Sequence, residues 1–335
     1  MRRELLPFAV VLLAVVTACG SPPPPPPAAP SLPPAAEPAQ SPPTAAAPAG
    51  TVVRVGDLPE GIVADPVTHL VAVGVRNPDR LAVLDAATGR TTASVPLPGH
   101  LRHLQLAAPG GPVLVPDENS NRLLSIDLPS GRVTGEIPTG SSPHDATRAA
   151  NGRVFAANEN GRSVAVVEGG KLVHTFTDVT QPAGLAAVGN LVGLVDVRQN
   201  DLSVYDAATL TRVARLPAGG GPTHVVADRR GHFAVIDTRG GAVLTYDPAA
   251  PAHALGRLDL PGTPYGVAYD ANRDRLWVTL TARNQLVGID LSGAEPRVVA
   301  TFPTVRQPNT VAVDPATGVR YVTGTVEGSV EIIPA

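Results

Sequence analysis

Three of the eight histidines, His103, His144 and His224, stand near the start of similar short segments: LRHLQLA, PHDATRA and PTHVVAD. Imidazole gains or loses a proton near neutral pH, so these side chains can serve as acid or base. Neutral imidazole is also a common ligand of divalent metals. Asp145 follows His144 and adds a carboxylate that suits either task. The sequence therefore indicates a polar site, provided that the segments meet in space.

Polar side chains occupy the same place in most of the related segments. The predicted ligand-binding set is Glu60, Arg102, His103, His144, Asp145, His224, Tyr265 and Asn309. His144 and His224 are the candidates for catalytic acid or base, and the three histidines are the candidates for a divalent metal such as zinc. Hydrogen bonding between neighbouring units is the structural alternative. His144 lies one residue earlier in its unit than His103 and His224 do, which weighs against a shared metal.

The elements that must position these residues form an internal repeat. A lead residue opens each unit, at Pro59, Leu101, Pro143, Pro182, Pro222, Pro264 and Pro308, with a spacing of about 40 residues. Four short apolar strands follow it, as in RLWVTLT and QLVGIDL. Such a sheet cannot bury both faces alone, but several packed around an axis can. Residues 51–335 are therefore predicted to be an all-β, seven-bladed β-propeller of four-stranded antiparallel blades, with six or eight blades as alternatives.

The two ends of the repeat region predict how the ring closes. The last unit stops after its third strand at Ala335, whereas Thr51 to Asp57 precedes the first unit as an unpaired strand. We expect this N-terminal strand to complete the last blade. The innermost strands then line one channel, and the polar segments converge at its mouth.

The predicted loops between second and third strands open on the same face. They add the polar residues Asp117, Glu118, Asn119, Asn158, Glu159, Asp196, Arg198, Asp237, Arg239 and Arg283. Loops on a rigid scaffold commonly carry function. Aspartates that end third strands, such as Asp85 and Asp206, are instead predicted to cap turns through backbone N–H groups.

A family resemblance appears in the last unit, PNTVAVDPATGVRYVTGTVEGSVEII. It is similar to the YVTN-type repeat of YncE-like β-propellers, with Tyr321-Val322-Thr323 followed by Gly324 where the family usually has Asn. Propellers related to that family include binding proteins of unclear role, sugar lactonases and an antibiotic lyase. The resemblance therefore implies either a ligand- or protein-binding module or a hydrolase or lyase of the lactonase type with its site at the mouth.

Composition narrows the classes of function. The formal net charge is -3 with 16% charged residues, which gives no electrostatic footprint for nucleic acid. The sequence has no Gly-x-Ser-x-Gly, His-Glu-x-x-His, phosphate-loop or dinucleotide motif. No cofactor is evident, although a divalent metal is possible, and no oligomer is required. A single cysteine allows no intrachain disulfide.

That cysteine, Cys19, follows a basic start and an apolar run from Leu5 to Ala18. The run is too short to span a bilayer and is typical of a cleaved secretory signal. Val16 to Cys19 resembles the lipobox of bacterial lipoproteins, which implies a signal peptide over 1–18 and lipidation of Cys19. An ordinary signal cleaved nearby and a twin-arginine signal are the alternatives.

Residues 20–50 are rich in proline and almost uncharged. Such a segment cannot bury a core, so 19–50 is predicted to be a disordered, extended linker. The expected protein is extracytoplasmic and held by lipid to the bacterial membrane or envelope, with a small molecule or an envelope protein as its partner.

Overall fold

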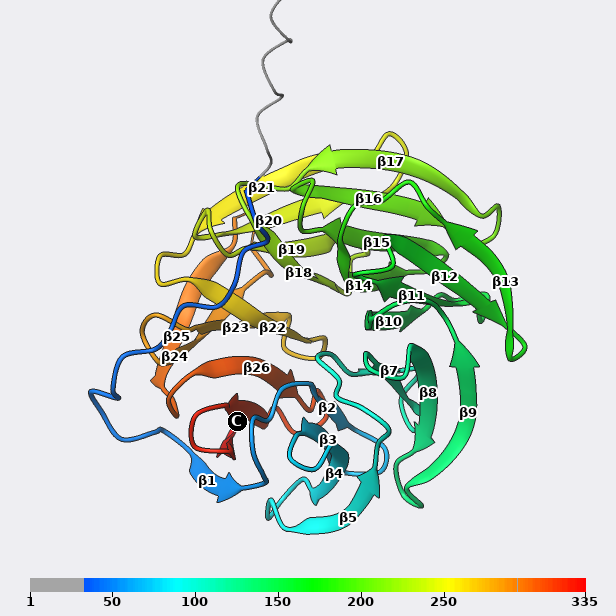
Figure 1. The fold of residues 1–335 in the computed structure, drawn as a ribbon. Coiled ribbons are helices and arrows are strands. Elements are labelled where there is room, and N and C mark those ends of the chain that lie inside the picture. The colour runs from blue at the N-terminus through cyan, green and yellow to red at the C-terminus, as the bar shows by residue number, and fades with distance from the viewer. Residues whose placement is uncertain (1–32, 294) are drawn as a thin grey trace, which may run out of the picture. The chain divides into compact units, whose positions relative to one another are not determined.

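Short strands joined by tight turns make up the computed structural model, which describes residues 33–293 and 295–335. The strands form seven antiparallel sheets of four strands each. The sheets stand around a central channel like the blades of a propeller (Figure 1). The predicted all-β, seven-bladed propeller is thereby confirmed. No helix in the described residues is long and apolar enough to cross a membrane.

Each blade runs from an inner strand to an outer strand. The inner strands are β2 (Ile62–Asp65), β6 (Gln105–Leu106), β10 (Pro143–Arg148), β14 (Pro182–Val188), β18 (Pro222–Ala227), β22 (Pro264–Asp270) and β26 (Pro308–Val313). The second strands are β3 (Leu70–Val75), β7 (Val113–Asp117), β11 (Val154–Asn158), β15 (Leu191–Asp196), β19 (Phe233–Asp237), β23 (Arg275–Leu280) and β27 (Arg320–Gly324). The third strands are β4 (Arg80–Asp85), β8 (Arg122–Asp127), β12 (Ser163–Glu168), β16 (Asp201–Asp206), β20 (Ala242–Asp247), β24 (Gln285–Asp290) and β28 (Ser329–Ile333). The outer strands are β5 (Thr91–Pro96), β9 (Arg132–Pro138), β13 (Lys171–Phe176), β17 (Thr211–Pro217), β21 (His253–Asp259), β25 (Arg297–Pro303) and β1 (Thr51–Arg54).

Burial explains the residue types of the strands. The second and third strands are buried along almost their whole length, as in β15 and β24, because each blade packs against a neighbour on both faces. The outer strands are largely exposed, with every second residue half-buried towards their ends, as in β17 and β21. Phe155, Phe233 and Tyr321 fill the space between blades and are almost inaccessible to solvent.

The two ends of the chain fasten the ring. Strand β1 pairs antiparallel with β28 and completes the sheet of β26, β27 and β28. The buried carboxylate of Glu331 accepts the N–H groups of Gly50 at 2.8 Å and of Val305 at 3.0 Å. The predicted closure by the N-terminal strand is thereby confirmed.

Buried aspartates at the ends of second strands shape the loops that lead into the inner strands of their own blades. Asp117 accepts the N–H groups of Gly99 and Ser120, both at 2.9 Å. Asp237 accepts those of Gly221 and Gly240, also both at 2.9 Å. Each aspartate is at most 1% exposed. At the opposite ends of the blades, the expected turn caps form as well, since Asp85 accepts the Thr88 N–H at 2.9 Å.

Residues 33–42, here called the strap, lie against the propeller. The strap crosses the blade of β18–β21 and the blade of β22–β25 before the chain reaches β1 (Figure 1). Its hydrogen bonds to the ring join Pro33 O to Arg198, Pro34 O to Arg239, Ala39 N to Thr281, Ala39 O and Ser41 N to Gln307, Ser41 O to Arg306, and Pro42 O to Asn284. Ala36 and Ser41 are buried.

The strap differs from the free linker expected up to residue 50. An extended proline-rich chain makes no hydrogen bonds within itself, so its carbonyl groups remain available to donors elsewhere. Arginine and amide side chains of the loops around the mouth supply those donors. The expected disorder of 19–32, the signal peptide of 1–18 and the lipidation of Cys19 lie outside the described residues.

Truncated chains distinguish the contribution of the strap to stability from that of the closure strand β1. Chains beginning at Pro33, Thr44 and Leu58 should unfold at successively lower denaturant concentrations. Loss of the strap removes several partly exposed hydrogen bonds and should lower the unfolding free energy by about 1–3 kcal/mol. Loss of β1 also exposes a strand edge and should promote aggregation. Denaturation curves of the three chains provide the measurement, and identical midpoints would contradict both roles.

Candidate functional site

The residues that follow each lead residue form two layers around the channel. The first residue after the lead, at what we call the mouth position, is Glu60, Arg102, His144, Ala183, Thr223, Tyr265 or Asn309. The second, at what we call the channel position, is Gly61, His103, Asp145, Gly184, His224, Gly266 or Thr310. Glycine at the channel position permits close contact between blades, since a Cβ on Gly266 would lie 2.4 Å from the Asn309 carbonyl oxygen.

Irregular pairing at the start of the inner strands turns these side chains towards the axis. In β10 the register shifts between Pro143 and Asp145, so His144 is the unpaired residue. In β18 the shift falls between Pro222 and His224, and His224 pairs with Ile236. A β-bulge bends its strand and re-aims side chains. The step falls at the same place in both strands, and the two histidines reach the His103 ring from different positions in their units.

Four rings from the two layers lie in contact, and we call them the ring partition. The His103 ring centroid lies 4.7 Å from that of His144 and 4.7 Å from that of His224. The Tyr265 ring centroid lies 4.6 Å from that of His224. The structure thus brings together four of the residues chosen from sequence, despite the offset of His144. That they bind a ligand stays a prediction.

His144 is the charged member of the ring partition. Its Nδ1 lies 3.0 Å from a carboxylate oxygen of Glu159 and 3.6 Å from one of Glu118. Burial alone would lower the pKa of His144, but the interactions with Glu118 and Glu159 outweigh it and raise the pKa to about 9. The same contacts outweigh burial at Glu159 and lower the pKa of that carboxyl to about 2. His144 is therefore an imidazolium at neutral pH.

The other two imidazoles are neutral. Burial lowers the pKa of His224 to about 3, and the charge on His144 adds to the effect. Burial and the charge on His144 also hold the pKa of His103 well below its usual range. Burial, reinforced by the neighbouring cation, thus keeps both rings unprotonated at neutral pH.

The rest of the mouth layer is nearly balanced in charge. The Arg102 guanidinium lies 3.1 Å from Glu118, and Glu60 pairs with Arg76. Glu118 and Glu159 come from the loops after β7 and β11, as the sequence places them, but their contact with His144 was not expected. Asn309 accepts a hydrogen bond from Gln307 at 3.2 Å, and Gln307 also holds the strap.

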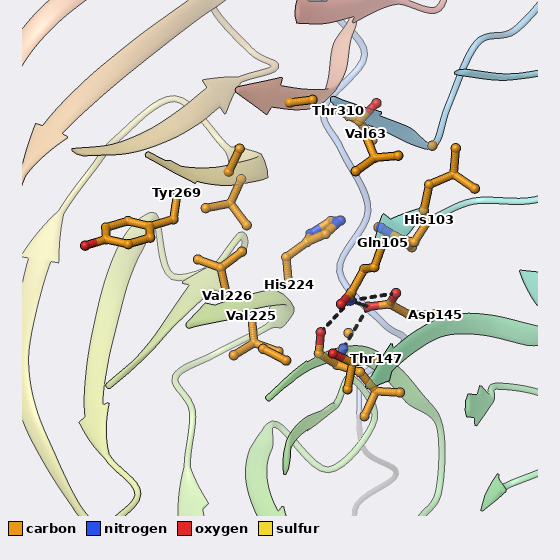
Figure 2. Close-up of a pocket in the computed structure, with 18 of the residues that line it drawn as sticks. Val63, His103, Gln105, Asp145, Thr147, His224, Val225, Val226, Tyr269 and Thr310 are labelled. Carbon is orange, nitrogen blue, oxygen red and sulfur yellow. Dashed lines mark hydrogen bonds between the residues drawn. The ribbon is translucent and has the colours of Figure 1, made fainter. Parts of the chain in front are cut away.

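A cavity of about 360 Å³ lies in the channel, with His103 and His224 among its lining residues. Its walls combine valine and alanine side chains from the inner strands, such as Val63 and Val226, with polar side chains such as Gln105 and Thr147 (Figure 2). Arg148 also lines the cavity. His103 also borders a much smaller cavity, lined by the mouth residues Glu60, Arg102, Tyr265 and Asn309. The ring partition therefore separates the polar mouth from a channel cavity of ligand size, which apolar and polar side chains line together.

Asp145 lies on the channel side of the ring partition and lines the cavity. Its carboxylate accepts the Leu185 N–H at 2.8 Å and the Gln105 amide nitrogen at 3.0 Å (Figure 2). Burial raises the pKa of Asp145 to about 7, although these hydrogen bonds oppose the shift. Gln105 was not among the residues selected from sequence, because a glutamine in a short strand carries no distinctive signal.

His224 has one ring nitrogen without a protein partner. Its Nδ1 lies 2.9 Å from the Thr223 hydroxyl, which lies 2.7 Å from the Thr238 hydroxyl. Its Nε2 is buried and has no hydrogen-bond partner. Figure 2 shows the ring of His224 pointing into the cavity. Because burying a polar atom without a partner costs free energy, this nitrogen is suited to a ligand.

The group best arranged for a metal differs from the three histidines proposed from sequence. Among the described residues, ligand atoms of Glu118, His144 and Glu159 lie within 4.8 Å of one another. One imidazole and two carboxylates form a donor set that zinc accepts. A metal would have to displace the proton of His144 and compete with Arg102 for Glu118. Metal binding therefore stays a prediction.

The charge on His144 predicts how stability varies with pH. The folded pKa of about 9 lies above the ordinary 6.5, so the stabilisation is complete below pH 6.5 and is lost as pH rises through 9. The unfolding free energy should fall by about 2–3 kcal/mol between pH 7 and 9.5. Asp145 contributes mainly below this window, because its pKa is raised only to about 7.

Denaturation of the wild type and two variants at several pH values measures this effect. His144→Gln should abolish most of the slope, whereas His253→Gln, an exposed control on β21, should preserve it. An equal slope in His144→Gln and the wild type would show that the imidazolium is not the cause.

Comparison with known proteins identifies the fold. No family model matches the chain, and no curated protein is similar to it in sequence. A chain of hydrazine synthase from Kuenenia stuttgartiensis is 18% identical, with a TM-score of 0.72 over 85% of this chain and 98% of that one. Streptogramin B lyase is 15% identical, with a TM-score of 0.71 over 84% and 96%. The β-propeller domain of Cps50 (Swd1) from Myceliophteria thermophila is 13% identical, with a TM-score of 0.70 over 85% and 99%. At these identities the similarity shows the β-propeller fold alone.

Proposed function

We propose that this protein is a lipid-anchored, extracytoplasmic binding module that holds a small molecule in the channel of its propeller. The observation that carries the proposal is the 360 Å³ cavity with the unpartnered His224 Nε2 on its lining. Pockets for small molecules are largely preformed, mostly apolar and furnished with a few polar groups. The channel has the size of such a pocket and combines apolar side chains with polar groups, and its walls come from the inner strands of several blades.

The anchoring part of the proposal rests on sequence. Val16 to Cys19 resembles a lipobox, and a proline-rich segment separates Cys19 from the strap. Lipid on Cys19 would hold the chain at a membrane, and residues 20–32 would set the distance between that membrane and the ring.

Substitution of the cysteine tests the anchor. Cys19→Ala removes the only thiol and should move the protein from the detergent phase to the soluble fraction or leave an unprocessed precursor. Phase partitioning and gel mobility of the full-length protein provide the measurement. Ser21→Ala serves as the matched control and should partition like the wild type. A Cys19→Ala protein that remains in the detergent phase with unchanged mobility would refute lipidation.

A hydrolase or lyase of the lactonase type is the second candidate. The observation in its favour is that charged His144 contacts neutral His103, so a proton donor and a proton acceptor lie side by side. Neighbouring groups whose pKa values are driven apart are typical of acid–base sites. In this candidate His144 is the acid and His103 the base, at the boundary between mouth and channel.

A ligand screen distinguishes the two candidates. Thermal-shift screening of neutral metabolites and lactones should identify compounds that stabilise the wild type, because a ligand that binds only the folded state raises its stability. His224→Phe should remove the shift, whereas His253→Gln should not. Unchanged shifts in His224→Phe would exclude the channel. Turnover of a hit that is lost in His144→Gln while binding persists would favour the enzyme.

A further inference from the structure

We propose that the channel is built for an uncharged ligand with an apolar body and a hydroxyl head group that lies against His224 and Gln105. This inference rests on the proposed channel site and specifies the chemistry of its ligand. It follows from three features of the cavity: its walls, the hydrogen-bonding groups near the ring partition, and the charges around both.

The walls specify an apolar body. Side chains of the inner strands present Val63, Val226, Val267, Val311 and several alanines to the cavity. Burial of apolar surface contributes roughly 25 cal/mol per Å². These side chains offer no hydrogen bonds, so a ligand with polar groups along its whole length would lose hydration without compensation.

The partition end of the cavity specifies the head group. Nε2 of His224 is a donor or an acceptor according to which of Nδ1 and the Thr223 hydroxyl donates in their 2.9 Å hydrogen bond. The amide nitrogen of Gln105 donates to Asp145 and to the Leu185 carbonyl at 2.7 Å, which leaves its amide oxygen as an acceptor for the ligand. A hydroxyl donates and accepts, so it satisfies both residues in either tautomer of His224.

The surrounding charges oppose an ionic head group. Asp145 and Arg148 both line the cavity, so an ionic head group of either sign would meet a like charge there. A carboxylate would in addition accept but not donate. An ammonium would stand near the ring partition, where His144 already carries a positive charge and lies 4.7 Å from His103 between ring centroids. Burying an unpaired ion is far more costly than burying a hydroxyl. The cavity therefore discriminates by charge as well as by shape.

Three probes of matched shape test the inference: cyclohexylmethanol, cyclohexanecarboxylate and cyclohexylmethylammonium. Calorimetric titration of the folded ring, residues 33–335, or saturation-transfer NMR at pH 7.5 gives the affinity of each. We expect the alcohol to bind at least tenfold more tightly than either ion. His224→Phe keeps a ring of similar size and should weaken alcohol binding about tenfold, the loss expected for one hydrogen bond. His253→Gln should leave all three affinities unchanged.

Two variants that fill the cavity, Ala187→Phe and Ala268→Phe, distinguish an error in the proposed ligand class from an error in the proposed channel site. Tighter binding of an ion than of the alcohol, abolished by a filling variant, would overturn the ligand class and retain the channel. Binding that survives in every folded filling variant, or the absence of binding by all three probes, would overturn both proposals. Circular dichroism and melting curves establish which variants fold, and the test needs only one of the two filling variants to be folded.

Discussion

The site depends on the bonds between buried carboxylates and backbone N–H groups that hold the loops leading into the inner strands. Asp117 and Asp237 fix these loops from within, and Asp196 does the same for Thr180, just before β14. An irregular step in pairing then turns the next residues towards the axis. Because five of the seven inner strands share this step in pairing, side chains that are distant in sequence arrive at one place. The carboxylates themselves contribute geometry and no chemistry to the ligand.

Crowding three imidazoles at the axis determines their charges. Of the three, only His144 has carboxylates within reach, so it keeps the proton, while burial and then the His144 charge hold the pKa values of His103 and His224 low. The resulting ring partition divides the channel into a mouth with nearly balanced charges and a cavity of mixed apolar and polar lining. A ligand in the cavity would contact one side of the ring partition, and acid–base chemistry would use the other side of the same residues. The strap lies over the mouth loops of neighbouring blades and leaves the cavity walls to the inner strands.

Sequence predicted the fold well because the propeller repeats its signals. Apolar strands recur in every unit after a lead residue, which is proline in six of the seven, and the unpaired strand before Pro59 predicted closure. From the sequence, the mouth residues could be placed around one ring, but the contacts between them could not be predicted. Nothing in the sequence reveals that His144 contacts His103 despite its offset, since the step in pairing is the same in β10 and β18. The contact of His144 with Glu118 and Glu159 likewise depends on the exact paths of two loops. The strap was not predicted because composition shows only that a segment cannot form a core of its own. It does not show that side chains of the folded ring, such as Arg198 and Arg239, donate hydrogen bonds to that segment.

Nitrogen-15 NMR of the histidine rings tests the division of charge most directly. Long-range proton–nitrogen correlations report whether each ring nitrogen carries a proton, and single His→Gln variants assign the signals. At pH 7.5 the account predicts that both nitrogens of His144 are protonated and that His103 and His224 are neutral. The His224 signals should remain those of a neutral ring down to about pH 4, in line with its pKa of about 3. A neutral His144 at pH 7.5, or a His224 that gains its proton near pH 6.5, would contradict the account.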